Sequence, residues 1–185
     1  MVIIAFEGID GTGKSTSIRL TSDFLASKAI PHLVTQELSG GEMQLKFRQM
    51  LIESATPMDE LLVISLARRW HYDNVLKPAL EAGKCILMDR YIESTWAYQG
   101  QNIEHDVLSF FEQKVWQTPK PDVVIYFDGN SLRAKARDRF EQKGTDFFAM
   151  ARKIYKSRAA NYPNWVSVIA GEQERVNSAI LQAIG

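Results

Sequence analysis

The sequence predicts an α/β fold in which five parallel strands form a sheet between two layers of helices. Short, apolar, β-branched segments alternate along the chain with longer segments of helical periodicity. Several of the short segments are apolar throughout, which is typical of strands covered on both faces. Such strands are joined by right-handed crossovers, and the sheets bind ligands at the carboxyl ends of their strands. The residues that follow each strand are therefore the first candidates for function.

The expected elements follow one another in a regular order. The first strand, residues 2–6, is an apolar segment that ends at Glu7 and a glycine-rich stretch, after which helical periodicity begins. Further strands are expected at residues 32–35, 85–88, 123–127 and 165–169. Helices are expected at residues 15–29, 42–53, 58–81, 107–116, 131–140, 146–160 and 172–184. No repeat or linker divides the chain, so we expect one domain over residues 1–185.

The composition excludes several classes of protein. Among the 185 residues, Lys and Arg number 22 and Asp and Glu number 22, so no overall cationic field attracts nucleic acid or an anionic membrane. We find no secretory signal and no segment near the ~20 apolar residues that cross a bilayer. The single cysteine, Cys85, can form no intramolecular disulfide and has no zinc-like spacing. We therefore expect a cytoplasmic protein that binds neither nucleic acid nor membrane.

The segment after the first strand carries a phosphate-binding motif. It matches the pattern G-x-x-x-x-G-K-[ST] between an apolar strand and a helix, the context that supports such a motif. Glycines let backbone N–H groups surround a phosphate, Lys14 can reach the β- and γ-phosphates, and the Ser15 hydroxyl can hold Mg²⁺. The residues expected to bind the nucleoside triphosphate are Gly8, Ile9, Asp10, Gly11, Thr12, Gly13, Lys14, Ser15 and Thr16. A glycine-rich turn that only connects strand to helix is the alternative.

A second polar pair, Asp89 and Arg90, follows the strand expected at residues 85–88. A carboxylate there could orient a magnesium-bound water, and the arginine beside it could clamp an acceptor phosphate through paired hydrogen bonds. Ser15 and Asp89 are thus the candidate metal ligands. A structural ion pair at the edge of the sheet is the alternative.

Two signatures resemble those of the thymidylate kinases. Residues 6–16 are similar to that family's opening, and residues 89–94, followed by Ala-Tyr-Gln-Gly at residues 97–100, are similar to its second signature. Further similarities at residues 77–80, 121–122, 138–142 and 146–155 extend the resemblance over nearly the whole chain. It implies a three-layer P-loop NTPase fold, like that of nucleoside monophosphate kinases. The implied reaction is the magnesium-dependent transfer of the γ-phosphoryl group of ATP to dTMP, giving dTDP and ADP.

The resemblance also assigns roles to individual residues. Arg68 is similar to the family arginine that donates to O4 of thymine, and Tyr98 to the tyrosine beneath the sugar that leaves no room for a 2′-hydroxyl. Lys14, Asp10 and Arg90 are the catalytic residues that it implies outside the lid. The residues expected to bind dTMP are Asp10, Glu37, Ile64, Arg68, Arg90, Ser94, Thr95, Tyr98 and Gln99.

Four cations lie within a segment of about residues 129–145: Arg133, Lys135, Arg137 and Arg139. This segment resembles the family's lid, whose arginines close over the phosphates. The resemblance makes Arg137 and Arg139 catalytic candidates and Arg133 a candidate for binding ATP. A solvated helix face is the alternative, because most charge runs are solvated faces.

Departures from the family pattern leave the substrate range open. Ile64 stands where the family usually has a phenylalanine that stacks on thymine, and the loop at residues 35–40 lacks the family's arginine and proline. A broader deoxynucleoside monophosphate kinase and a deoxynucleoside kinase are alternatives. A nucleoside hydroxyl needs a carboxylate base, whereas dTMP already carries an ionised nucleophile. A nucleotide-binding switch without phosphoryl transfer is the non-enzymatic alternative.

The resemblance implies a homodimer, because the family is typically dimeric through helices. An apolar face along Leu61, Leu62, Ser65 and Leu66 could form the contact between subunits. Burial of these residues in the core explains the same pattern equally well.

Overall fold

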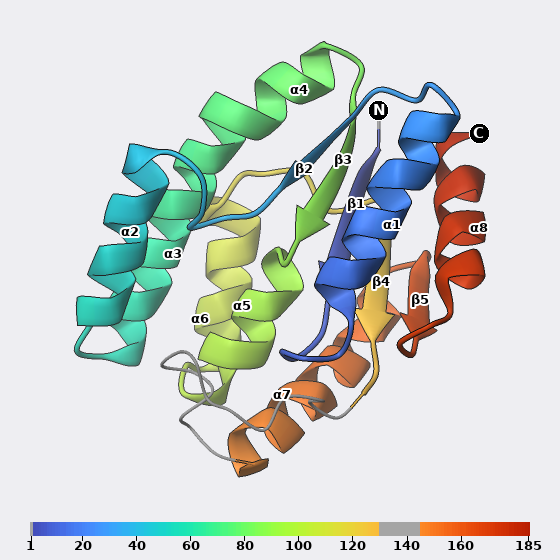
Figure 1. Cartoon of the computed structure of the whole chain (residues 1–185). Helices are drawn as coiled ribbons and strands as arrows, with labels where there is room; N and C mark the ends of the chain where they lie inside the picture. The colour runs from blue at the N-terminus through green and yellow to red at the C-terminus, as the bar shows by residue number, and fades with distance from the viewer. Residues whose placement is uncertain (1, 130–144) are drawn as a thin grey trace.

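The computed structural model describes residues 2–129 and 145–185, and its centre is a parallel sheet of five strands (Figure 1). The strands are β1 (Ile3–Glu7), β2 (His32–Thr35), β3 (Cys85–Asp89), β4 (Val123–Phe127) and β5 (Trp165–Val168). They lie in the order β2-β3-β1-β4-β5, so that β1 pairs with both β3 and β4. The predicted strands are confirmed, and each boundary differs by one residue at most.

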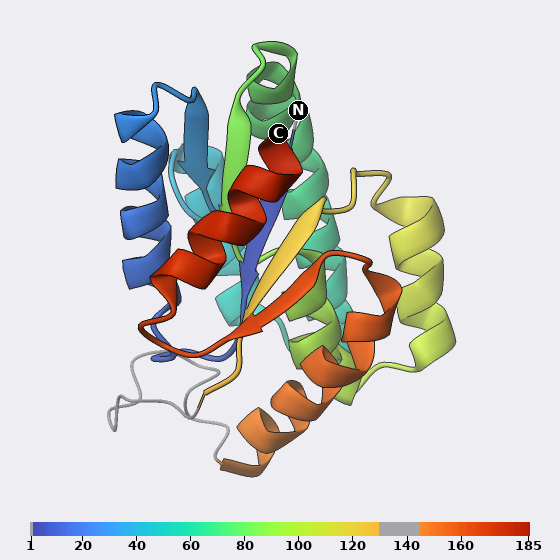
Figure 2. The ribbon, with the colours of Figure 1, turned by 90° about the vertical axis from the view of Figure 1, so that its right-hand side faces the viewer.

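Helices cover both faces of this sheet. They are α1 (Lys14–Ser27), α2 (Glu42–Glu53), α3 (Pro57–His71), α4 (Lys77–Glu81), α5 (Ile92–Tyr98), α6 (His105–Phe110), α7 (Thr145–Arg158) and α8 (Gln173–Ile184). Figure 2 shows α1 and α8 on one face of the sheet, with α3, α5 and α6 on the opposite face. No helix in residues 2–129 and 145–185 is long and apolar enough to span a membrane.

The alternation of side chains along β1 explains why both faces need helices. Ile4 and Phe6 pack into a core cluster with residues of α1 and α8, including Ile18. Ile3 and Ala5 face the other way, into a cluster with residues of α3 and α5. Because every residue of β1 is buried, the strand is apolar without the alternation of a half-exposed strand. Glu7, its last residue, is the exception, and its partners are described below.

Two expected helices are interrupted, and one helix was not expected. The helix expected over residues 107–116 is α6 followed by a π-helical segment, Phe111–Val115. The helix expected over residues 58–81 is divided by a π-helical segment, Tyr72–Leu76, which joins α3 to α4. Pro78 has no N–H to donate to the residue four positions back, so a regular α-helix cannot continue through this region. The sequence also failed to predict α5, because six of its seven residues are buried and no polar face reveals a helical period. The helix expected at residues 131–140 lies outside the described residues.

Candidate active site

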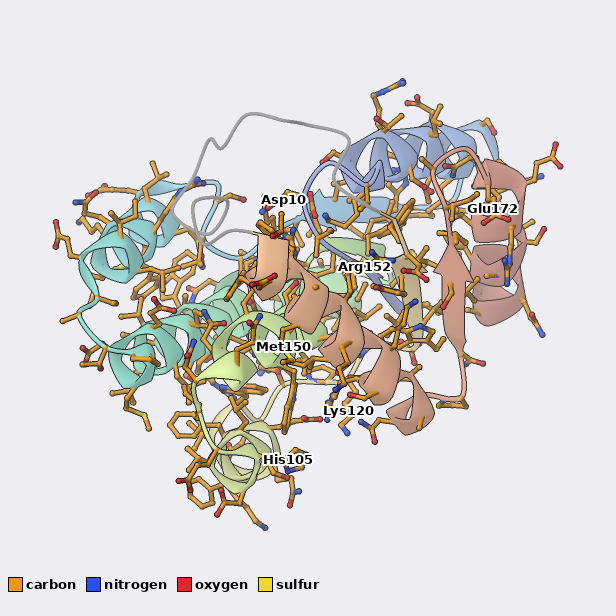
Figure 3. All side chains as sticks on the ribbon, turned by 90° about the horizontal axis from the view of Figure 1, so that it is seen from below. Asp10, His105, Lys120, Met150, Arg152 and Glu172 are labelled. Atoms are coloured by element: carbon orange, nitrogen blue, oxygen red, sulfur yellow. The ribbon has the colours of Figure 1, made fainter. Side chains whose placement is uncertain are left out.

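The phosphate loop leaves β1 at the carboxyl edge of the sheet and enters α1. Figure 3 looks at this edge from below and shows Asp10 near its middle. Gly8 has a φ of 134°, and a Cβ added there would lie 2.7 Å from the carbonyl oxygen of Phe127 at the end of β4. Gly8 is therefore required both by its backbone conformation and by the close approach of β4.

Lys14 is the first residue of α1 and is buried within the loop. Its Nζ donates to the Ile9 carbonyl oxygen at 2.8 Å and lies 3.9 Å from Oδ1 of Asp10. Burial, together with the nearby positive charge of Arg90, lowers the pKa of Lys14 to about 7, against the opposing effect of the nearby carboxylates. The lysine is thus held inside the loop at the position that the motif predicts.

Arg90 connects the phosphate loop to the residues that follow β3. Its guanidinium donates to Oδ1 of Asp10 at 2.6 Å, to the Ser94 hydroxyl at 3.2 Å and to the Tyr155 hydroxyl at 3.3 Å. It also lies over the Tyr98 ring, 5.2 Å from the centroid. The alternative of an ion pair is correct in one respect, since Arg90 does form one, but the partner is Asp10 of the loop rather than the adjacent Asp89.

Arg68 lies on α3 with only 1% of its side chain exposed. Its guanidinium forms paired hydrogen bonds with the Glu37 carboxylate, at 2.8 and 2.9 Å, and donates to the Thr95 hydroxyl at 2.9 Å. It also packs over the ring of Trp116, 4.4 Å from the centroid. Glu37, expected from the sequence to bind dTMP, thus compensates the charge of a buried guanidinium.

A cavity of about 610 Å³ lies between these two arginines. All nine residues expected to bind dTMP line it, together with Asp89. The cavity has an arginine paired with the phosphate loop at one end and a second arginine on α3, with apolar walls from Ile64 and neighbouring residues. Its volume and mixed lining fit a small polar ligand with a ring and an anionic group.

Comparison with known proteins identifies the family. The family model described as thymidylate kinase matches residues 6–180. This chain belongs to the thymidylate kinase family. The thymidylate kinase of Nitrosomonas europaea is 33% identical over 98% of this chain and 91% of its own length, and that of Janthinobacterium sp. strain Marseille is 35% identical over 90% and 86%. The crystal structure of thymidylate kinase from Ehrlichia chaffeensis has the same fold, with a TM-score of 0.76, 24% identity, and coverage of 100% and 98% of the two chains.

Some residues that line the thymidylate kinase cavity were missed by sequence reasoning. Arg48, Leu51 and Ile52 come from α2, and Gln36, Leu38 and Tyr91 come from loops beside the strands. The spacing of Arg48 and Ile52, four residues apart on a helix, places them on one face and was the available signal. Because α2 lies far along the chain from the glycine-rich phosphate loop, nothing in the sequence linked this face to a ligand site.

The candidate metal ligands come from α1 and from the end of β3. Ser15 is exposed at the start of α1, and Asp89 ends β3, beside Phe6 in the register of the sheet. No cluster of three or more His, Cys, Asp or Glu side chains suited to a metal occurs among residues 2–129 and 145–185. A magnesium ion that travels with nucleotide phosphates needs only one or two protein oxygen ligands, so this donor set fits it.

The lid residues Arg133, Lys135, Arg137 and Arg139 lie outside the described residues. The helix that follows them, α7, contributes Tyr155 to the Arg90 cluster. Arg152, one turn earlier on α7, instead forms an ion pair with Asp128 after β4, at 3.0 Å. Tyr155 and Arg152 of α7 therefore bind two different partners, Arg90 and Asp128.

Proposed function

We propose that this thymidylate kinase family member binds dTMP in the cavity over α5 and transfers to it the γ-phosphoryl group of ATP held by the phosphate loop. Family membership establishes the ATP-dependent phosphorylation of dTMP. The observation that carries the residue assignments is the contact between Arg90 and Asp10, which joins the acceptor cavity to the donor loop. An acceptor phosphate on Arg90 would lie beside the loop that holds the donor.

The chemistry of this arrangement is positioning rather than base catalysis. The acceptor phosphate of dTMP is already ionised, so no side chain has to remove a proton before attack. Arg90 can hold that phosphate by paired hydrogen bonds, and Lys14 can offset charge on the transferred group. Asp10 orients the guanidinium of Arg90, and this role explains a carboxylate at that position without a general base.

Mg²⁺ is the cofactor that the site would use. The Ser15 hydroxyl and the Asp89 carboxylate would hold it, directly or through water, because magnesium takes oxygen ligands and keeps several of its waters. When bound, Mg²⁺ neutralises part of the charge on the phosphates of ATP. The protein groups around it, above all Lys14 and Arg90, supply the remaining positive charge.

At the other end of the cavity, α3 and α5 supply the residues proposed to recognise the base. The Arg68 guanidinium is fixed by Glu37 and Thr95, so it presents its donors in a single orientation. A thymine carbonyl accepts from such donors, whereas the amino group of cytosine would oppose them. Ile64 adds an apolar wall beside Arg68 but no aromatic ring.

The decisive experiment is an ADP-release assay with ATP and Mg²⁺ over a panel of nucleosides and their monophosphates. We expect turnover with dTMP, little with dCMP and none with thymidine. Turnover of thymidine in preference to dTMP would instead indicate a nucleoside kinase. ATP consumption that no acceptor stimulates would indicate a nucleotide switch. Omission of Mg²⁺ should abolish turnover, and its addition should restore it.

We also propose that the protein is a homodimer that forms through α3. The face considered in the sequence is divided: Leu61 and Ser65 are buried in the core, whereas Leu62 and Leu66 are 52% and 53% exposed. Met58, one turn earlier, is also exposed, so the helix carries an outer apolar stripe with a spacing of four residues. A stripe of this kind favours an intersubunit contact.

Light scattering after size exclusion tests this contact. Leu62→Glu should convert a dimer into a monomer. Leu20→Glu on α1 is the matched control, because Leu20 is also partly exposed but lies on the opposite face of the sheet. A monomeric wild-type protein, or a dimer that survives Leu62→Glu, would contradict the proposal.

A further inference from the structure

The backbone at Arg90 is held in a conformation that L-residues rarely adopt. Its φ is 66°, in the left-handed region. The two amides that flank this conformation are both bound by the end of β1: the N–H of Arg90 donates to the Phe6 carbonyl oxygen at 3.0 Å, and the N–H of Tyr91 donates to Oε1 of Glu7 at 2.8 Å. The unusual backbone is therefore fixed from outside, by the neighbouring strand.

The second carboxylate oxygen of Glu7 acts on the side chain of the same arginine. Oε2 of Glu7 accepts from the Ser94 hydroxyl at 2.6 Å and from the Tyr155 hydroxyl at 3.3 Å. These are the two hydroxyls to which the Arg90 guanidinium donates. Glu7 thus holds Arg90 twice, through its backbone and through the partners of its guanidinium.

Glu7 itself is fully buried and does not line the cavity, so it does not reach the substrate. Among the described residues, the ion-pair partner of Arg90 within 4 Å is Asp10 and not Glu7. Burial raises the pKa of Glu7 to about 7, against the opposing effect of Arg90. The carboxyl group therefore acts on Arg90 indirectly. It is long enough to accept hydrogen bonds both from the Tyr91 N–H and from the Ser94 and Tyr155 hydroxyls.

We infer that Glu7 is a positioning residue that sets the orientation of Arg90 toward the acceptor phosphate. The inference rests on the proposed role of Arg90 as the clamp for that phosphate. It predicts a result that a purely structural role does not predict. Shortening the Glu7 side chain must weaken binding of the phosphate group of dTMP and leave binding of the nucleoside part unchanged.

Two conservative variants separate reach from charge. Glu7→Gln keeps the length of the side chain and an acceptor oxygen for the Tyr91 N–H but removes the charge. Its NH2 group takes the place of Oε2 and can donate to the Ser94 and Tyr155 hydroxyls, because a hydroxyl accepts as well as donates. Glu7→Asp keeps the charge but shortens the side chain by one methylene, so one carboxylate can no longer reach both sets of partners. Both variants keep a polar group in the same buried place, which favours folding of each.

The readout is calorimetric binding of dTMP, of thymidine and of ATP to each variant. We expect Glu7→Asp to weaken the affinity for dTMP on the order of tenfold or more, because the charge-assisted hydrogen bonds of Arg90 to the phosphate are lost. The affinities for thymidine and ATP should stay within about twofold of wild type. Glu7→Gln should stay within about threefold of wild type for all three ligands. Glu93→Asp is the matched control, since it shortens another fully buried carboxylate, on α5, that contacts neither Arg90 nor Tyr91. In that control the ratio of dTMP to thymidine affinity should not change.

Three outcomes would overturn the inference. An equal loss of affinity for dTMP and for thymidine in Glu7→Asp would mean that Glu7 has a structural role. Weaker dTMP binding in Glu7→Gln, with wild-type binding in Glu7→Asp, would mean that the charge of Glu7 matters and the length of its side chain does not. Loss of ATP binding alongside dTMP would mean that Glu7 supports the adjacent phosphate loop. Arg90→Met tests the underlying assignment separately: if it does not weaken dTMP relative to thymidine, Arg90 is not the phosphate clamp, whatever Glu7 does.

Discussion

Arg90 donates to Asp10 across the carboxyl edge of the sheet, at 2.6 Å, and thereby joins the residues after β3 to the phosphate loop after β1. Both strands are buried neighbours in the sheet, with Phe6 of β1 opposite Asp89 of β3. The parallel register therefore brings together two segments that lie 80 residues apart in the sequence. The ion pair therefore fixes Arg90, at the acceptor cavity, relative to the phosphate loop that would hold the donor.

Replacement of Asp10 by asparagine tests the role of this pair. The variant keeps a carbonyl oxygen for Arg90 but loses the charge, so kcat/KM for dTMP should fall by about tenfold. Measurable turnover should remain, because an ionised acceptor phosphate needs no base. Steady-state kinetics at saturating ATP will show the change. A loss beyond about 10⁴-fold in kcat would instead identify Asp10 as a general base and favour a nucleoside substrate.

Lys14 is the second target. Lys14→Met keeps most of the side chain's length but removes the charge that stabilises the transferring group, so kcat should fall on the order of 10²–10³-fold. A folded variant with near-native turnover would contradict the assignment.

Calorimetry provides an independent check on Lys14. Its pKa of about 7 rises when the phosphates of ATP bind, so the wild-type protein should take up a proton at pH 8. Titrations in buffers of different ionisation enthalpy measure that uptake, which Lys14→Met should lack.

Arg68 and its neighbour Arg69 offer a matched pair for testing base selectivity. Arg68 is buried and forms paired hydrogen bonds with Glu37, whereas Arg69 is exposed and forms paired hydrogen bonds with Asp73, in the π-helical segment that follows α3. Arg68→Lys loses the planar fork, so the preference for dTMP over dCMP in kcat/KM should fall by about tenfold or more. Arg69→Lys should leave that ratio unchanged. Equal effects of the two substitutions would show that Arg68 does not read the base.

The sequence predicted the sheet and the phosphate loop well because both depend on local signals. A continuous apolar segment followed by glycines and Lys14 needs no knowledge of distant residues. The contacts of Arg90 with Asp10 and Tyr155 were not predicted, because they arise from strand order and from the packing of α7, which no periodicity encodes. Glu7 was taken only as the end of an apolar segment, since a carboxylate at a strand end gives no sign that it is buried.

The cavity wall shows the same division between local and distant signals. Nine lining residues were predicted from the resemblance, but the contribution of α2 depends on how that helix packs on α3. That packing brings Leu51 and Ile52 into the lining of the same cavity as Ile64. Sequence alone could identify these residues as apolar positions on helices and could not assign them to a ligand.

Ile64 is the position at which the family's aromatic ring is missing, and it lines the cavity. Ile64→Phe should lower the KM for dTMP, because an aromatic side chain stacked on the base adds ~0.5–1.5 kcal/mol of binding free energy. The open cavity beside it gives the larger ring room, so the overpacking expected in a closed core does not apply. Thermal unfolding will control for stability. An unchanged or higher KM in a stable variant would mean that Ile64 does not face the base.

The raised pKa of Glu7 predicts how stability varies with pH. Burial raises this pKa from 4.5 to about 7, so the folded protein binds a proton that the unfolded chain has lost between these pH values. Stability from this group is therefore full below about pH 4.5 and falls as the pH rises toward 7, by up to roughly 3 kcal/mol, since each pKa unit corresponds to ~1.4 kcal/mol. Glu7→Gln cannot titrate, so the free energy of unfolding of wild type relative to this variant should decline between pH 5 and pH 7 and then level off. Lys14, whose pKa is lowered to about 7, contributes to the pH dependence mainly above pH 7, so the decline between pH 5 and pH 7 reports chiefly on Glu7. Urea denaturation of both proteins at pH 5, 6, 7 and 8 measures it, and a difference that stays constant would show that Glu7 ionises normally in the folded state.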